Sequence, residues 1–258
     1  MFELFSDIFA CRDNALARMD ARPKMVIAFT LIIAVVLSRQ PYFPFLMFVL
    51  CTAGMLWLKM PAKLVLARLV MPMGIVLVLV VLQAFLTGST PFVSFSFAGY
   101  RFIGTEEGIM QGVLLGSRVL GAVSVMLLLS SVTPAFKIFG AMQWFRVPEG
   151  WIEIALLVYR YTFVLLDQTA DTAAAQRVRL GYSSPRRALS SAGVLAGTVV
   201  VRSMDQAMRT HEAMTLRGYQ GRLPVGVLPK LKTADYFSML AVPTLTAALY
   251  VIAEWWPK

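Results

Sequence analysis

Two arginines at the ends of predicted helices are the residues whose type and spacing best fit a chemical role. The sequences AQRVR and AMTLR each place an alanine four residues before an arginine, and a glycine and a tyrosine follow closely in both copies. Four-residue spacing puts each alanine on the same helical face as its arginine. The two pairs are Ala175 with Arg179 and Ala213 with Arg217. Because the planar guanidinium of arginine pairs with a carboxylate through two hydrogen bonds, the pattern predicts a docking surface for an acidic partner.

A structural role for these arginines is the alternative. A cation in the last turn of a helix interacts favourably with the helix dipole and the free carbonyl groups, which stabilises the helix by about 0.3 to 1 kcal/mol. That effect accounts for either arginine by itself. The recurrence of alanine, arginine, glycine and tyrosine in both copies favours docking.

Signatures of catalysis and of metal binding are missing from the sequence. It contains no glycine loop ending in Gly-Lys-Ser or Gly-Lys-Thr, no HExxH and no nucleophilic serine framed by glycines. His211 is the only histidine, and Cys11 and Cys51 are far apart, whereas a transition-metal site needs several such donors. We expect no catalytic residue, no metal and no cofactor bound by this chain.

The composition is that of an integral membrane protein. The 258 residues are 58% hydrophobic and 15% charged, with a mean hydropathy of +0.70, which is too apolar for a soluble domain. A net charge of +10 would indicate nucleic acid in a soluble protein, but here it first indicates membrane topology. We expect the lipid bilayer, and no nucleic acid, as a partner.

Apolar segments predict an all-α integral membrane protein with about five transmembrane helices. A span needs about 20 mostly apolar residues, or fewer where neighbours shield it. The segments that qualify are 25–38, 42–58, 69–87, 109–131 and 236–254. Residues 88–105 alternate small polar and aromatic side chains, which fits a short hairpin and an aromatic-rich interfacial loop equally well.

Basic residues predict the orientation of these spans. With a cytoplasmic N-terminus, 20 of the 24 lysines and arginines lie in cytoplasmic segments. The first apolar run begins only at Met25 and follows acidic residues, so we expect a retained span and not a cleaved signal peptide. The N-terminus is therefore predicted inside and the C-terminus outside.

Long helices separate the last predicted span from the others. Helices are expected at about 134–146, 149–180 and 185–217, and Gly218 ends the last of them. The apolar residues 151–166 either span the membrane or lie along its surface.

Three segments of the chain follow from this organisation. We predict transmembrane helices in residues 1–132, a cytoplasmic or membrane-surface region of long helices in 133–233, and a C-terminal transmembrane helix in 234–258.

Small residues recur at helical spacing in two places. Gly108, Gly112 and Gly116 give the fourth span one thin face, against which a helix of this chain or of a partner subunit can pack. Gly193 and Gly197 would permit a close crossing of the two long helices, or are merely tolerated small residues.

Arg118 lies inside the fourth predicted span, where a charge is costly unless it is paired or faces water. One expectation is a contact with a partner subunit or a cavity. The other is snorkelling or an internal hydrogen bond.

Asp167 and Asp171 are the one close pair of aspartates. A membrane-embedded enzyme that acts on lipid or isoprenoid substrates would need clustered aspartates or histidines at membrane depth. The alanine-rich neighbourhood of this pair and the arginines downstream favour a solvated helix instead.

With these features in this order, the chain resembles the transmembrane T component of energy-coupling factor (ECF) transporters, and in particular the cobalt-type CbiQ family. The resemblance covers nearly the whole chain. It rests on the order of the spans, the long helical region, the segment Tyr159-Arg160-Tyr161 and, most specifically, the segment AMTLRGY at 213–219.

The resemblance implies that the two long helices are coupling helices, whose arginine-centred triplets dock into two ATPase subunits. Carried over, the triplets are 178–180 and 216–218, centred on Arg179 and Arg217. The family pattern has small residues beside the arginine, so the valine and leucine of the first triplet depart from it. Arg177 is therefore an alternative to Arg179.

For function, the resemblance implies a scaffold subunit of an ABC-type importer in the bacterial inner membrane, with no catalytic activity of its own. Two ABC-type ATPase subunits would bind ATP and Mg²⁺, and a separate membrane S component would bind the solute. The cobalt-type family implies cobalt uptake linked to cobalamin biosynthesis, with nickel or a vitamin as alternatives. A stand-alone channel or carrier is a further rival, but only Arg118 and Gln83 stand out as polar residues in the spans.

Overall fold

A computed structural model describes residues 19–58, 60–87, 91–97, 100–221, 231 and 233–255, so that Cys11 lies outside it. The chain packs as two compact units. The first combines Met1–Ile138 with Pro229–Lys258, and the second is Phe139–Leu228. The first contains the predicted spans and the second the two long helices, while a coupling role for 133–233 stays a prediction.

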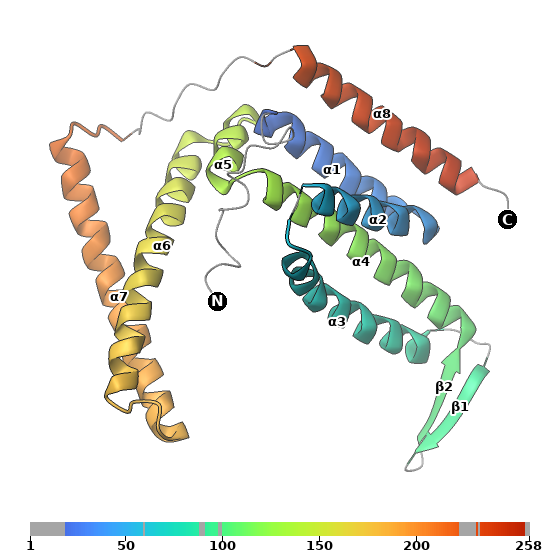
Figure 1. The fold of residues 1–258 in the computed structure, drawn as a ribbon, viewed down its shortest axis with the longest axis horizontal. Coiled ribbons are helices and arrows are strands. Elements are labelled where there is room, and N and C mark those ends of the chain that lie inside the picture. Colours follow the sequence, from blue (N-terminus) through green and yellow to red (C-terminus); the bar gives the residue numbers. More distant parts are fainter. Residues whose placement is uncertain are drawn as a thin grey trace. The chain divides into compact units, whose positions relative to one another are not determined.

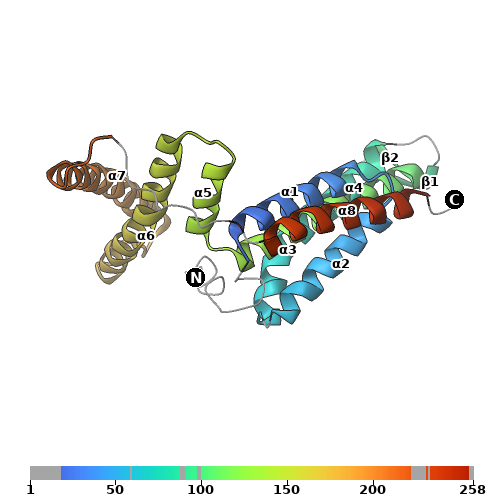
Figure 2. The same ribbon diagram turned by 90° about the horizontal axis from the view of Figure 1, so that it is seen from above.

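The first unit is a bundle of helices (Figures 1 and 2). Its helices are α1 (Ala21–Leu37), α2 (Tyr42–Trp57), α3 (Ala62–Leu86), α4 (Glu106–Val132) and α8 (Thr233–Trp255).

Three described helices are long and apolar enough to cross a membrane, at Ala62–Leu86, Glu106–Val132 and Asp235–Ala253. α1 and α2 have only 17 and 16 residues. The predicted helical membrane fold is confirmed, and the five expected spans correspond to three full-length helices and two short ones.

A β-hairpin connects α3 to α4. Its strands β1 (Pro91–Phe97) and β2 (Tyr100–Thr105) pair antiparallel, with Phe97 opposite Tyr100. Of the two alternatives for this segment, the structure therefore has the hairpin. It is the only sheet in the part of the chain that the structure describes.

α4 occupies the centre of the bundle and packs against α1, α2 and α3. Its thin face meets α3: a Cβ added at Gly108, Gly112 or Gly116 would lie 2.5, 3.0 or 2.7 Å from the nearest α3 atom. Side chains at these positions would push the two helices apart. The glycine face is thus used within this chain.

α3 presents an apolar surface to its surroundings. It buries only Val65 and Leu69, whereas Leu66 and Met71 are 68% and 82% exposed. An exposed apolar face of this length fits a bilayer and not water.

The second unit holds the long helices. α5 (Ala135–Trp144) runs across the boundary between the units, α6 is Glu149–Val178 and α7 is Pro185–Leu216. Ser184 caps α7, since its side-chain oxygen accepts a hydrogen bond from the backbone N–H of Arg187 at 3.4 Å. Proline follows in the first turn, where its missing N–H costs nothing.

Candidate docking site

α6 and α7 form an antiparallel pair joined by a short turn (Figure 1). Polar side chains mark their register. The contacts run in order along the pair: Gln176 Nε2 to the Ser191 carbonyl (3.1 Å), Arg202 Nη1 to Thr172 Oγ1 (3.0 Å), Thr210 Oγ1 to the Tyr161 hydroxyl (2.9 Å), and the Tyr219 hydroxyl to Glu153 Oε2 (3.3 Å). Because the helices are antiparallel, Arg179 and Arg217 lie at opposite ends of the pair. The 32 residues of α7 separate them by about 48 Å.

The two arginine-bearing helix ends share one backbone geometry. Arg179 and Arg217 are the C-cap residues of α6 and α7. The next residue has a positive φ in both cases, +58° at Leu180 and +84° at Gly218. The N–H after that donates to a carbonyl five residues back, at 2.9 Å from Gly181 and 3.0 Å from Tyr219. This is a Schellman cap at each end.

The shared cap identifies the structural counterpart of Arg217. Arg179 holds the same C-cap position, whereas Arg177 lies within the last turn of α6. Leu180 takes the place of Gly218, although the left-handed conformation costs a side chain about 1 to 2 kcal/mol. Matching the glycines of the two segments by sequence misses this equivalence, because Gly181 lies one position later in the cap than Gly218.

Apolar side chains flank both arginines and are exposed. Val178 and Leu180 are 85% and 65% exposed beside Arg179, and Leu216 is 89% exposed beside Arg217. Large apolar side chains next to an exposed cation at a helix end are a feature of contact surfaces, where burial against a partner compensates for them. The two alanines contribute little bulk: Ala175 and Ala213 are both exposed.

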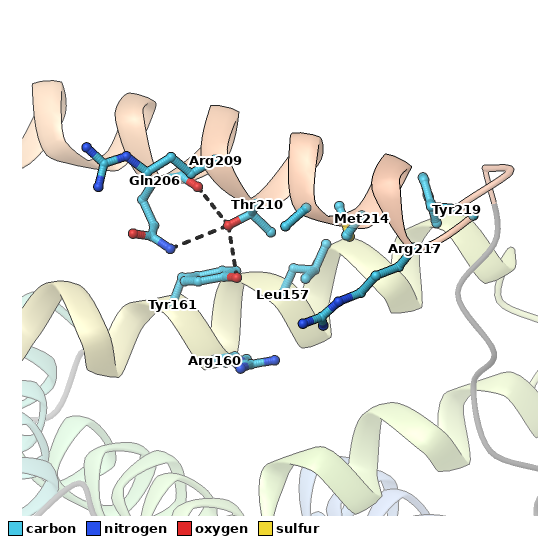
Figure 3. A pocket seen from close by; sticks show the side chains of 11 residues that line it. Leu157, Arg160, Tyr161, Gln206, Arg209, Thr210, Met214, Arg217 and Tyr219 are labelled. Carbon is cyan, nitrogen blue, oxygen red and sulfur yellow. Dashed lines mark hydrogen bonds between the residues drawn. The ribbon is translucent and has the colours of Figure 1, made fainter.

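A groove of about 690 Å³ lies beside Arg217, between α6 and α7 (Figure 3). Leu157, Arg160 and Tyr161 line it from α6. The lining from α7 and its end consists of Gln206, Arg209, Thr210, Ala213, Met214, Arg217, Gly218 and Tyr219. Figure 3 shows the side chain of Arg217 extending from α7 toward α6.

A hydrogen bond joins α6 and α7 inside the groove. Tyr161 and Thr210 join the helices through their hydroxyls, and Gln206 Nε2 donates to Thr210 Oγ1 at 3.5 Å. Tyr161 therefore braces the helix crossing.

Tyr219 is held against Glu153, which is 5% exposed. Partial burial, the negative charge of Glu153 and the hydrogen bond to it raise the pKa of the Tyr219 phenol. The phenol therefore stays protonated at neutral pH, and this contact ties the end of α7 to the start of α6.

The interpretation of Gly193 and Gly197 as a helix-crossing motif is wrong. A Cβ added at either position would meet nothing within 4 Å. The close approach lies instead at Gly181, where a Cβ would come within 2.6 Å of Ser191 Oγ and 2.9 Å of the Gln176 carbonyl. Gly193 and Gly197 do not lie at the crossing, so their spacing could not reveal it.

Arg118 makes an internal hydrogen bond. Its Nε and Nη2 lie 3.0 and 2.6 Å from the backbone carbonyl oxygen of Ser38, the C-cap of α1. Gln83, the other polar residue noted in the spans, donates from Nε2 to Gln111 Oε1 at 3.1 Å. Both polar groups are thus used between helices of the first unit.

Asp167, Asp171 and His211 are exposed on the long helices. Among the residues that the structure describes, no three His, Cys, Asp or Glu side chains come together in a way that would hold a metal ion.

Arg160 and Arg209 are lining residues of the groove that the sequence did not single out as docking residues. The signal that could have found them is the shared helical face of Arg209, Ala213 and Arg217, which follow one another at four-residue spacing. Arg160 could not be found in this way, because its place opposite Arg209 and Arg217 depends on the register of α6 against α7.

A family comparison decides the class of the protein. The family model described as CbiQ, cobalt transport protein, matches residues 12–225. The chain belongs to the CbiQ family. The resemblance expected from the paired arginine motifs is confirmed.

The relatives of this CbiQ-family chain include proteins named for cobalt transport. An uncharacterized protein of Methanocaldococcus jannaschii is 28% identical over 230 residues, which are 89% of this chain and 86% of that protein. The cobalt transport protein CbiQ of Rhodobacter capsulatus is 35% identical over 121 residues, 47% of this chain and 49% of its own length. A protein of Methanocorpusculum labreanum, whose name describes a fused cobalt transport protein CbiMQ, is 26% identical over 214 residues, 81% of this chain and 35% of its own length. The alignments thus span half or less of the two relatives named for cobalt transport.

Membership of the CbiQ family, together with the apolar helices, makes this chain a multi-pass membrane component of a cobalt transport family. That family is one of transport components and not of catalysts.

Proposed function

We propose that this CbiQ-family protein is the transmembrane T subunit of an ECF-type ABC importer. In this role it transmits the closure of two ATPase subunits to a membrane subunit that binds the solute. The two arginine-bearing helix ends would move with the ATPases, and α6 and α7 would act as rigid levers between them.

The observation that carries this proposal is the matched pair of helix ends. Arg179 and Arg217 have the same cap geometry, are both exposed, and each have an exposed apolar neighbour. They lie at opposite ends of one helix pair. A separation of about 48 Å is long enough for each arginine to meet a different subunit. Neither a single docking site nor a purely structural cation would require two such arginine-bearing helix ends.

Cobalt is the solute that the family supports best, for uptake linked to cobalamin biosynthesis, with nickel or a vitamin as alternatives. The name of the fused CbiMQ relative joins a CbiQ part to a second component, which supports an assembly of more than one component. ATP and Mg²⁺ would be bound by the ATPase subunits. The distribution of basic residues supports a cytoplasmic N-terminus, and the family resemblance implies the bacterial inner membrane as the location.

A membrane-embedded enzyme is the alternative from another class. It would require acidic or histidine side chains gathered at membrane depth. Asp167 and Asp171 are exposed on the polar half of α6, which gives this alternative little support.

Co-purification tests the proposal. Tagged wild-type protein should bring down the ABC-type ATPase encoded beside it, whereas the Arg179→Glu, Arg217→Glu double variant should insert into the membrane but lose the ATPase. Lys59→Glu with Lys63→Glu is the matched control, because it makes the same charge change near the start of α3, outside both arginine-bearing helix ends. Retention of the ATPase by the Arg179/Arg217 variant, or its absence from the wild-type sample, would overturn the T-subunit assignment.

A further inference from the structure

The groove beside Arg217 gathers three arginines and no acidic side chain. Arg160, Arg209 and Arg217 line it, and its other lining residues are neutral. Glu153, whose carboxylate is bonded to the lining residue Tyr219, is itself buried. The lining therefore has a charge that nothing in the described groove balances.

None of the three arginines is paired with a carboxylate of the described chain. The guanidinium group of Arg160 lies over the ring of the adjacent Tyr161, with its Cζ 5.8 Å from the ring centroid. Like charges in one concave site repel one another and raise the local potential for anions. Such an arrangement is favourable when an anionic group from outside occupies the site.

The neighbouring polar groups leave the guanidinium groups available. Tyr161, Thr210 and Gln206 are bonded to one another across the helix pair. Tyr219 is bonded to Glu153. The donors that remain for an incoming group are thus chiefly those of the arginines, whose forks suit carboxylate oxygens.

The two docking ends differ in the number of arginines that they present. Arg179 lies between the exposed side chains of Val178 and Leu180. Arg217 is followed by a glycine and shares its groove with two further arginines. A partner that meets the first end finds one cation between apolar side chains, whereas a partner that meets the second finds a cationic groove.

We propose that the groove between α6 and α7 receives an acidic segment of the ATPase subunit that docks at Arg217, and that Arg160 and Arg209 are binding residues for it. This inference rests on the proposed function. It makes the two ends unequal, because the Arg217 end depends on charge over several side chains and the Arg179 end relies more on apolar contact.

Arg217 favours a protein occupant over a lipid headgroup. It belongs both to the groove and to the helix end assigned to the ATPase. A partner that covers the end of α7 therefore lies directly over the groove and can extend an acidic segment into it. Exposed arginines that add to an interface in this way mainly speed association and make the affinity depend on salt.

The test measures binding of the purified ATPase to the full-length chain in nanodiscs of neutral phosphatidylcholine. Wild type is compared with the Arg160→Gln, Arg209→Gln double variant at about 50 and about 300 mM NaCl. We expect the variant to bind about tenfold more weakly at low salt, with a difference of about twofold at high salt. The control Lys59→Gln with Lys63→Gln removes the same charge near the start of α3 and should stay within about twofold of wild type at both salt concentrations.

Three outcomes would overturn the inference. The first is equal binding by wild type and the Arg160/Arg209 variant at both salt concentrations while Arg217→Glu still weakens it, which leaves the T-subunit function intact. The second is a deficit that appears only in nanodiscs containing phosphatidylglycerol, which would assign the groove to a lipid headgroup. The third is the absence of any ATPase binding by wild type, which would remove the proposed function itself. Recovery of affinity in Arg160→Lys, Arg209→Lys would support charge as the cause.

Discussion

Arg118 caps the end of another helix, because two nitrogens of its guanidinium donate to the single carbonyl oxygen of Ser38. Ser38 is fully buried and closes α1, which is only 17 residues long. A helix of that length falls short of the ~20 residues that span a bilayer, so its last carbonyl groups need partners inside the protein. The arginine in the middle of α4 supplies one of them.

Replacing Arg118 by methionine should lower the free energy of unfolding by about 2 kcal/mol, because it removes charged donors from a buried carbonyl group. Arg118→Lys keeps the charge but loses the forked guanidinium, so its free energy of unfolding should lie between those of wild type and Arg118→Met. Thermal unfolding in detergent measures the effect. An unchanged midpoint for Arg118→Met would mean that the hydrogen bonds do not support α1.

Charge reversal should separate Arg177 from Arg179. The cap geometry makes Arg179 the counterpart of Arg217, so Arg179→Glu should weaken retention of the ATPase by tenfold or more, about 1.4 kcal/mol. Arg177→Glu should have an effect of about threefold or less. Quantitative co-purification with the ATPase compares the two. The reverse ranking would transfer the docking role to Arg177.

Leu180→Gly should stabilise the end of α6. Leucine at a φ of +58° costs about 1 to 2 kcal/mol, part of which glycine loses again through its greater freedom in the unfolded chain. A net gain of up to about 1 kcal/mol is expected in thermal unfolding. Leu180→Ala removes the same side-chain bulk but keeps the unfavourable backbone, so it should show no gain. Equal behaviour of the two variants would argue against backbone strain at this position.

The glycines of the membrane helices should differ sharply in their tolerance of alanine. At Gly108 a Cβ would lie 2.5 Å from two backbone carbonyl oxygens, whereas at Gly74 it would meet nothing within 4 Å. Gly108→Ala should therefore cost about 1 to 3 kcal/mol through overpacking, and Gly74→Ala should be neutral or slightly stabilising. Unfolding midpoints of both variants check this. A tolerated alanine at Gly108 would show that α3 and α4 can separate at no cost.

Tyr219 should be among the last tyrosines to ionise. Because the pKa of its phenol is raised in the folded chain, the contact with Glu153 contributes stability below the unfolded value of about 10 and is lost as the pH rises through the folded value. Ultraviolet titration should show that Tyr219→Phe lacks a component that ionises above pH 10. Loss of a component at or below that value would mean that the phenol is solvated.

The sequence predicted the helices better than their contacts. The caps at Ser184 and Gly218 and the apolar runs define each helix locally, and these elements are present. The length of α1 was also apparent, but the group that completes its last turn was not, because Arg118 lies 80 residues away along the chain.

The prediction of contacts between helices failed where the sequence pattern fits two packing arrangements. Gly193 and Gly197 have the spacing of a crossing motif, yet only the rotation of α7 decides which face meets α6. The equivalence of Leu180 with Gly218 was hidden for another reason, since a leucine in the left-handed conformation contradicts local preference and is held there by the surrounding cap.

α7 contains no residue that the rest of the chain buries. Most helices in proteins gain their stability from tertiary packing, so this one has to gain much of its own from whatever covers it. Folding of this segment and assembly of the complex are then linked equilibria, and the supply of partner subunits sets how much of α7 is protected. In a cell that makes this chain in excess, proteases should cut α7 first, and the surplus copies would be removed.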